Sequence, residues 1–153
     1  MDAHIRKIVS GGQTGVDRAA LDVAIYLGIE HGGWCPAGRF AEDGLIPEIY
    51  RLTETETSEY AERTERNVID SDGTLILYWK TISGGTLLTE RLARKHRRPY
   101  VGIDLSLSTE VGDAQHWLAQ SSIAVLNVAG PRESSAPKLT PLAENFLLRL
   151  LET

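Results

Sequence analysis

The chain contains a single cysteine, Cys35, among its 153 residues. A disulfide within the chain is therefore excluded, and so are the Cys-x-x-Cys patterns of zinc and redox sites. The four histidines are scattered without the spacing of metal ligands, so no metal site is expected. This cysteine usage is typical of a reducing compartment, and we expect a cytoplasmic protein in which Cys35 is a partly buried structural thiol.

Long hydrophobic runs and an excess of basic residues are also absent. No apolar segment approaches the roughly 20 residues that span a membrane, and the first residues lack the basic and apolar regions of a secretory signal. The formal net charge is −5, so no global field favours nucleic acid or an anionic membrane. We expect one domain over residues 1–153, with neither nucleic acid nor a membrane as partner.

Apolar segments of two kinds alternate along the chain. The continuous apolar run 73–79 is typical of a parallel strand buried on both faces. Other segments repeat their apolar residues at helical spacing. Strands are expected at 5–9, 32–35, 73–79, 100–104 and 123–128. Helices are expected at 16–27, 58–70 and 87–97, around 111–118, and from Thr140 as N-cap with Pro141 following. This order predicts an α/β fold, a Rossmann-like three-layer sandwich with a mostly parallel sheet.

The first strand runs directly into a glycine-rich turn, Ser10–Gly15, and then into a helix. Free backbone N–H groups and the positive end of the helix dipole make such a turn a potential anion site. Thr14 and Asp17 resemble a capping box for this helix. The turn is neither G-x-G-x-x-G nor a P-loop, because no lysine follows the glycines.

Two further glycine turns are expected on the same edge of the sheet. Residues 83–86 follow the strand through Leu77, and residues 127–134 follow the last strand. Ligands of open parallel sheets bind at the carboxyl ends of the strands. We therefore expect a phosphate-bearing small molecule, with Arg132 as a bidentate clamp and Arg39 in a lid. The ligand-binding candidates are Gly11, Gly12, Gln13, Thr14, Gly15, Arg18, Arg39, Gly84, Gly85, Thr86, Gly130, Arg132 and Ser134.

Other polar and aromatic residues have structural as well as functional interpretations. Arg63 and Asn67 lie four apart on one helix face, and we interpret them as a surface that forms salt bridges with Glu59. Trp34 can stack on a base, whereas Trp117 has the helical spacing of a core residue.

Six sequence blocks are familiar: SGGQTGVDRAALD, GGWCPAGRFAEDG, YAERTERNV, SDGTLIL, GGTLLTE and LNVAGPRES. Together they resemble the family named "putative molybdenum carrier", the circularly permuted YpsA branch of the SLOG superfamily. The resemblance implies a Rossmann-like domain that binds a nucleotide, a nucleotide-derived sugar or a related phosphate ligand. The family name implies the molybdenum cofactor, a pterin bearing a phosphate, as a bound ligand. Proteins of this family often assemble, so we expect a homo-oligomer, with the apolar final helix as its surface.

Superfamily relatives include enzymes that cut the base from a nucleoside monophosphate, with a P-G-G-x-G-T-x-x-E turn. Residues 83–90 keep the glycine pair and place Glu90 at a comparable distance, but they lack the proline and the inner Gly-Thr. The leading interpretation is a small-molecule binding protein. One alternative is an N-glycosidase or phosphoribohydrolase with Glu90 or Glu133 as acid–base group. Another is a sensor module whose ligand controls a partner.

Overall fold

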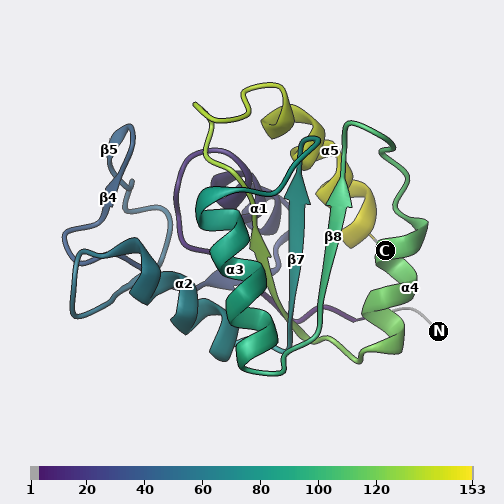
Figure 1. Ribbon diagram of the computed structural model, residues 1–153, viewed down its shortest axis with the longest axis horizontal. Helices are drawn as coiled ribbons and strands as arrows, with labels where there is room; N and C mark the ends of the chain where they lie inside the picture. Colours follow the sequence, from purple (N-terminus) through teal and green to yellow (C-terminus); the bar gives the residue numbers. More distant parts are fainter. Residues whose placement is uncertain (1–3, 153) are drawn as a thin grey trace.

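A five-stranded parallel sheet forms the centre of the protein in the computed structural model, which describes residues 4–152 (Figure 1). The strand order is β2-β1-β9-β7-β8, and every neighbouring pair is parallel. The strands are β1 (Lys7–Val9), β2 (Glu30–Gly32), β7 (Gly73–Tyr78), β8 (Tyr100–Asp104) and β9 (Val125–Ala129). The predicted α/β class with a mostly parallel sheet is confirmed.

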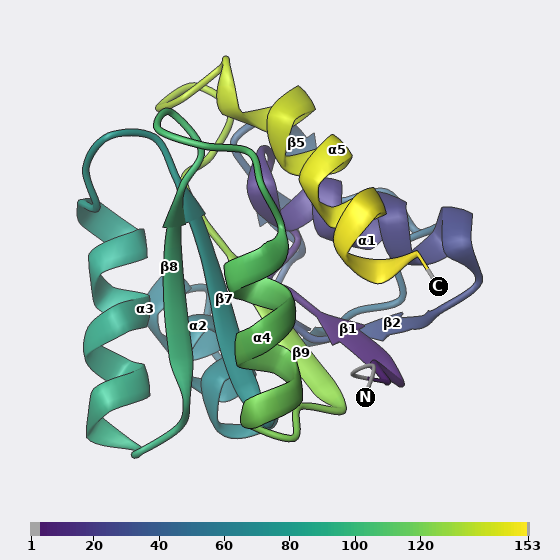
Figure 2. The same cartoon turned by 90° about the vertical axis from the view of Figure 1, so that its right-hand side faces the viewer.

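Helices cover both faces of the sheet and give three layers (Figure 2). One face carries α2 (Tyr60–Ile69) and α3 (Gly84–Lys95). The other carries α1 (Val16–Leu27), α4 (Gly112–Gln120) and α5 (Leu139–Leu151). Within residues 4–152, no helix has the length and apolarity needed to cross a bilayer.

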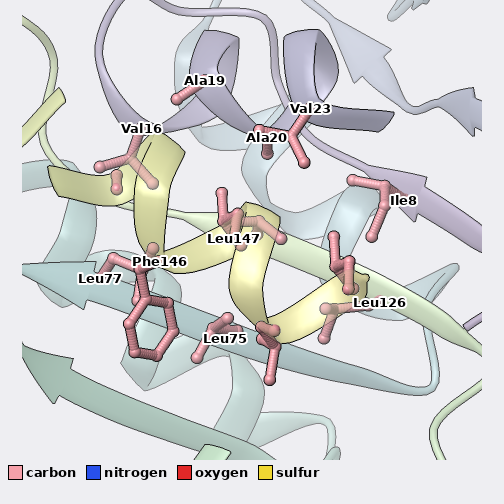
Figure 3. Close-up of a cluster of buried hydrophobic side chains, with 14 of the residues drawn as sticks. Ile8, Val16, Ala19, Ala20, Val23, Leu75, Leu77, Leu126, Phe146 and Leu147 are labelled. Atoms are coloured by element: carbon pink, nitrogen blue, oxygen red, sulfur yellow. The ribbon is translucent and has the colours of Figure 1, made fainter. Parts of the chain in front are cut away.

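The main core lies between α1, α5 and the sheet (Figure 3). Phe146 and Leu147 of α5 pack here with Leu75 and Leu77 of β7, and all four are fully buried. Burial of β7 on both faces explains its continuous apolar sequence. The apolar face of α5 is buried in this core. The expectation that this face offers a surface for oligomer formation is therefore wrong.

Short strands outside the main sheet build a second, smaller core. β3 (Trp34–Cys35) pairs with β6 (Thr53–Glu54), and β4 (Phe40–Ala41) forms a hairpin with β5 (Gly44–Leu45). Their cluster contains Cys35, Ala41 and Ile46. Cys35 is fully buried, and this burial raises the pKa of its thiol. The thiol is more deeply buried than predicted, and this burial is consistent with the structural role expected for it.

Substituting Cys35 tests its structural role. In Cys35→Ser a hydroxyl enters an apolar site, so we expect the free energy of unfolding in urea to fall by about 1–3 kcal/mol. Cys35→Ala brings no hydroxyl and provides the matched control. If the protein binds a phosphate-bearing ligand, as the sequence leads us to expect, its affinity for AMP, measured by calorimetry, should change less than twofold in both folded variants. A tenfold loss of affinity in folded Cys35→Ser would contradict a purely structural role.

Several predicted boundaries are corrected by the structure. The expected strand 32–35 is divided between β2 and β3, because Gly33 has φ of +125° and an added Cβ there would lie 2.3 Å from the Ser10 carbonyl oxygen. Helix α3 begins at Gly84 rather than Leu87, so the glycine pair belongs to its first turn. The N-cap of α5 is Lys138 instead of Thr140.

Candidate functional site

A cleft opens at the carboxyl edge of the sheet, between β9 and β7. The chain leaves β7 toward α3 on one face and leaves β9 toward α5 on the other (Figures 1 and 2). Such a switch point is where open α/β sheets bind ligands. The cleft has a volume of about 370 Å³. It is lined by Gly11, Gln13, Asp17, Tyr60, Arg63, Thr64, Asn67, Ser83, Gly84, Gly85, Thr86, Leu88, Thr89, Asn127, Val128, Ala129, Gly130, Pro131, Arg132 and Ser135.

Arg63 of α2 reaches from one wall of the cleft toward the first glycine turn. Its Nη1 donates to the Gly11 carbonyl oxygen at 2.9 Å and lies 3.4 Å from Oδ2 of Asp17. Its Nε donates to the Thr64 hydroxyl. An added Cβ at Gly11 would lie 2.1 Å from this Nη1, so the absence of a side chain at Gly11 makes room for the guanidinium. The arginine is therefore part of the cleft and not of the predicted salt-bridged surface.

Asp17 stands in the first turn of α1 with its side chain only 9% exposed. Its Oδ2 accepts the N–H of Gln13 at 3.3 Å. Burial raises the pKa of this carboxyl to about 6, although the guanidinium of Arg63 acts in the opposite direction. The predicted capping box is wrong, because the N-cap is Gly15 without a side-chain bond and the Thr14 hydroxyl bonds to Glu42 instead.

The N-terminus of α3 forms another wall. Its N-cap, Ser83, makes no side-chain capping bond. The cleft is lined by Ser83 and by Gly84 and Gly85, the first residues of this helix. The positive end of the helix dipole therefore lies at the cleft. An added Cβ at Gly85 would meet no atom within 4 Å, so this part of the cleft is open. Such a helix end favours a negatively charged ligand group.

The segment after β9 closes the third side. Asn127 is buried in β9, and its Nδ2 donates to the Thr74 hydroxyl. At Gly130, an added Cβ would lie 2.4 Å from the Leu77 carbonyl oxygen and 2.6 Å from Val16. This glycine therefore allows the turn to pass close to β7 and α1. Arg132, which follows it, lines the cleft from an exposed position.

The structure brings seven of the predicted ligand-binding residues together in the cleft lining, and it places the others elsewhere. Those in the lining are Gly11, Gln13, Gly84, Gly85, Thr86, Gly130 and Arg132. Of the described residues, those outside the lining are Gly12, Thr14, Gly15, Arg18, Arg39 and Ser134. Gly12 lies next to Leu52, because a Cβ added at Gly12 would be 2.6 Å from the Leu52 side chain.

Three of the residues outside the lining bind the β4–β5 hairpin through their side chains: Thr14, Arg18 and Ser134. The Glu42 carboxylate accepts bonds from the hydroxyls of Thr14 and Ser134. These bonds hold the pKa of Glu42 below its usual value. Arg18 forms two bonds to the Asp43 carboxylate, at 2.9 and 3.1 Å. The hairpin is thus held against the turns that follow β1 and β9.

Arg39 organises its own loop and does not extend over the cleft. It has φ of 57°, and its guanidinium donates to the carbonyl oxygens of Ile46, Pro47 and Tyr50. These bonds leave the guanidinium engaged within the loop. The predicted lid position of Arg39 is therefore not what the structure shows.

Neither glutamate proposed for catalysis lines the cleft formed by the described residues. Glu90 faces Arg94, one turn further along α3, at 3.4 Å. The carboxylate of Glu133 accepts the Thr140 hydroxyl. Asp17, which the sequence predicts to be a capping residue, is instead the carboxylate that the structure places in the lining.

Trp34 lies outside this cleft, behind Asn67. Both its backbone N–H and its carbonyl oxygen bond to the Asn67 side chain, at 2.8 and 3.0 Å. Its ring packs 4.1 Å from the Arg66 guanidinium carbon, and its indole N–H donates to Asp70. Trp117 packs at the edge of the main core, as its helical spacing predicted.

Sequence reasoning does not single out three of the cleft residues, Asp17, Arg63 and Asn67. Asn127 lies in the segment 127–134, which the sequence does place at this edge. The spacing of Arg63 and Asn67 did show that they share a helix face. It could not show that this face is turned inward, because that depends on how α2 packs. Within residues 4–152, no group of three or more His, Cys, Asp or Glu is placed to hold a metal ion.

The comparisons with known proteins identify the family and support the fold. The model of the circularly permutated YpsA SLOG family matches residues 8–151, and the chain belongs to this family. A crystal structure of a protein from Syntrophus aciditrophicus SB, named "putative molybdenum carrier protein", is 45% identical. The match covers 100% of this chain and 98% of that one, with a TM-score of 0.94. A comparison with curated proteins gave no match.

Proposed function

We propose that the protein binds a phosphate-bearing small molecule in the cleft: a nucleotide, a nucleotide sugar or the molybdenum cofactor. The observation that carries this proposal is that Arg63 and the N-terminus of α3 line the same cleft. A guanidinium and a helix N-terminus both favour an anionic oxygen group. The volume of about 370 Å³ lies within the range of small-molecule pockets.

The molybdenum cofactor enters this proposal as a cargo. The support is family membership and the name of the 45% identical protein from Syntrophus aciditrophicus. The only cysteine, Cys35, is buried in the smaller core, so no thiolate from this chain is available in the cleft. The residues present suit a phosphate and polar ring edges rather than a bare metal ion. A bound cofactor would therefore be held through its phosphate and pterin.

Replacing Arg63 tests the proposal directly. We expect Arg63→Met to weaken AMP binding about 10- to 100-fold, because charge-assisted hydrogen bonds contribute about 1.5–3 kcal/mol each. Arg66→Met is the matched control, since Arg66 lies on the same helix, is exposed and packs on Trp34 outside the cleft. Calorimetry at fixed salt measures both affinities. Equal affinities in the two variants would remove the basis of the proposal.

The hydrolytic alternative gains no support from Glu90 and Glu133, given their positions. When the protein is incubated with AMP and free adenine is measured by chromatography, we expect little release of adenine.

The proposal also includes a cytoplasmic location and a homo-oligomeric state. The exposed residues Phe40 and Leu45, which pair across the β4–β5 hairpin, are one apolar surface available for assembly.

A further inference from the structure

The cleft contains one buried acid that the proposed function does not use. Of the described residues in the lining, Asp17 alone carries a carboxylate. Its Oδ2 contacts two donors, the Gln13 N–H at 3.3 Å and Nη1 of Arg63 at 3.4 Å. Both contacts are long for charge-assisted hydrogen bonds, which are usually about 2.7–2.9 Å. The backbone of Gly11 and the charge of Arg18 also favour the carboxylate, but these contacts together do not offset the effect of its burial.

We propose that the cleft takes up its anionic ligand together with a proton, and that Asp17 holds this proton. The inference rests on the proposed function and adds a regulation of the same site by pH. In chemical terms, the Asp17 carboxylate becomes a carboxylic acid, and the proton comes from the solvent through the cleft that Asp17 lines.

A ligand that binds Arg63 shares this cation with Asp17. The Nη1 atom of Arg63 already serves both the Gly11 carbonyl oxygen and the Asp17 carboxylate. An oxyanion that binds Arg63 places a second negative charge within reach of Asp17. Two like charges at a shared site disfavour each other, so one of them takes up a proton. Burial already raises the pKa of Asp17 to about 6, so the nearby charge of the ligand raises it further, toward neutral pH.

The other charged groups around Asp17 do not relieve this conflict. Arg18, the next residue on α1, lowers the pKa of Asp17, but its guanidinium is bound to Asp43 of the hairpin. Arg132, from the segment after β9, is exposed at the cleft and lowers the pKa of Glu42. Glu42 in turn bonds to Thr14 and Ser134. Arg63 is thus the cation in direct contact with Asp17.

Linkage makes the effect reciprocal. If the bound anion raises the pKa of Asp17 by one unit, then protonating Asp17 strengthens anion binding about tenfold. The affinity should therefore increase as the pH falls from 8 to 5. This dependence belongs to the protein and not to the ligand, so it should also be seen with an anion that does not titrate in this range.

The experiment uses sulfate, which remains a dianion over this pH range. Sulfate affinity is measured at pH 8 and pH 5 from the amide NMR shifts of Gly85 and Gly130, in wild type, Asp17→Asn and Arg63→Met. The pKa of the Asp17 carboxyl is followed by its ¹³C shift with and without sulfate. We expect about tenfold tighter binding at pH 5 in wild type and a pH-independent affinity in Asp17→Asn. The Asp17 pKa should rise by about one unit in the presence of sulfate.

Two results would overturn proposals at different levels. In the first, sulfate binds at the cleft and Arg63→Met abolishes this binding, but the wild-type affinity does not depend on pH and sulfate does not raise the pKa of Asp17. The proposal of proton uptake is then wrong, whereas the proposed binding site stands. If neither sulfate nor AMP shifts the cleft amides at either pH, the proposed function fails as well. Native-like spectra of Asp17→Asn exclude unfolding as the cause of a lost pH dependence.

Discussion

Asp17→Asn is expected to become more stable relative to the wild-type protein as the pH rises from 4 to 7. The pKa of Asp17 is about 6 in the folded protein, against an ordinary value of 3.8. The folded state thus binds this proton more tightly than the unfolded state. The stabilisation that the wild-type protein gains from this proton is complete below about pH 4 and is lost as the pH rises through 6. A difference of about two pKa units corresponds to about 3 kcal/mol.

Urea denaturation of both proteins at several pH values measures this change. The difference in the free energy of unfolding should be small near pH 4 and grow to about 3 kcal/mol in favour of Asp17→Asn by pH 7. Taking the difference removes the contributions of other carboxyls that the two proteins share. Asp113→Asn, in the first turn of α4, is the exposed control. A constant difference across the pH range would show that burial does not penalise the Asp17 charge.

Gly130→Ala is expected to cost about 3 kcal/mol of folding free energy. The new Cβ would lie 2.4 Å from the Leu77 carbonyl oxygen, which belongs to the backbone of β7 and cannot rotate away. Val16 lies 2.6 Å from the same point and is fully buried. Overpacking a fixed site typically costs about 1–3 kcal/mol, and two rigid neighbours place this case at the upper end.

Gly112→Ala gives the matched comparison for this prediction. An added Cβ at Gly112 meets no atom within 4 Å, and alanine favours the first turn of α4. Thermal unfolding should show a clear fall in midpoint for Gly130→Ala and no fall for Gly112→Ala. Similar midpoints for the two variants would mean that the turn after β9 can move away from β7. AMP binding should then be examined, because Gly130 also lines the cleft.

The fold could be predicted from sequence because its main signals are local. The run 73–79 is apolar enough to require burial on both faces, and β7 has that burial. Helical periodicity located α1 almost to the residue, with Gly28 in the left-handed conformation at its end. The strands β3 to β6 have two residues each, and a pattern of two residues cannot be distinguished from a loop.

The site was only partly predictable, because its chemistry depends on packing between distant segments. Glycine turns can be located from sequence, and Gly11, Gly84 and Gly130 do meet in one cleft. The role of Gly11 could not be foreseen, since it depends on the arginine that α2 places 52 residues later in the chain. Likewise, Glu90 and Arg94 are four residues apart on α3 and pair with each other, which ordinary helix spacing allows.

The position of β9 has a consequence for how the chain reaches this structure. β9 is the last strand in sequence but lies in the middle of the sheet, where Val9 pairs with Asn127 and Leu75 pairs with Val128. Without β9, the β1–β2 pair and the β7–β8 pair share no edge. We therefore expect the edges of β1 and β7 that β9 covers to stay unpaired during synthesis until the segment around residue 125 has left the ribosome. Such long-range closure folds slowly and exposes the chain to aggregation. Because the cleft lies between β9 and β7, we expect it to form only after β9 has joined the sheet.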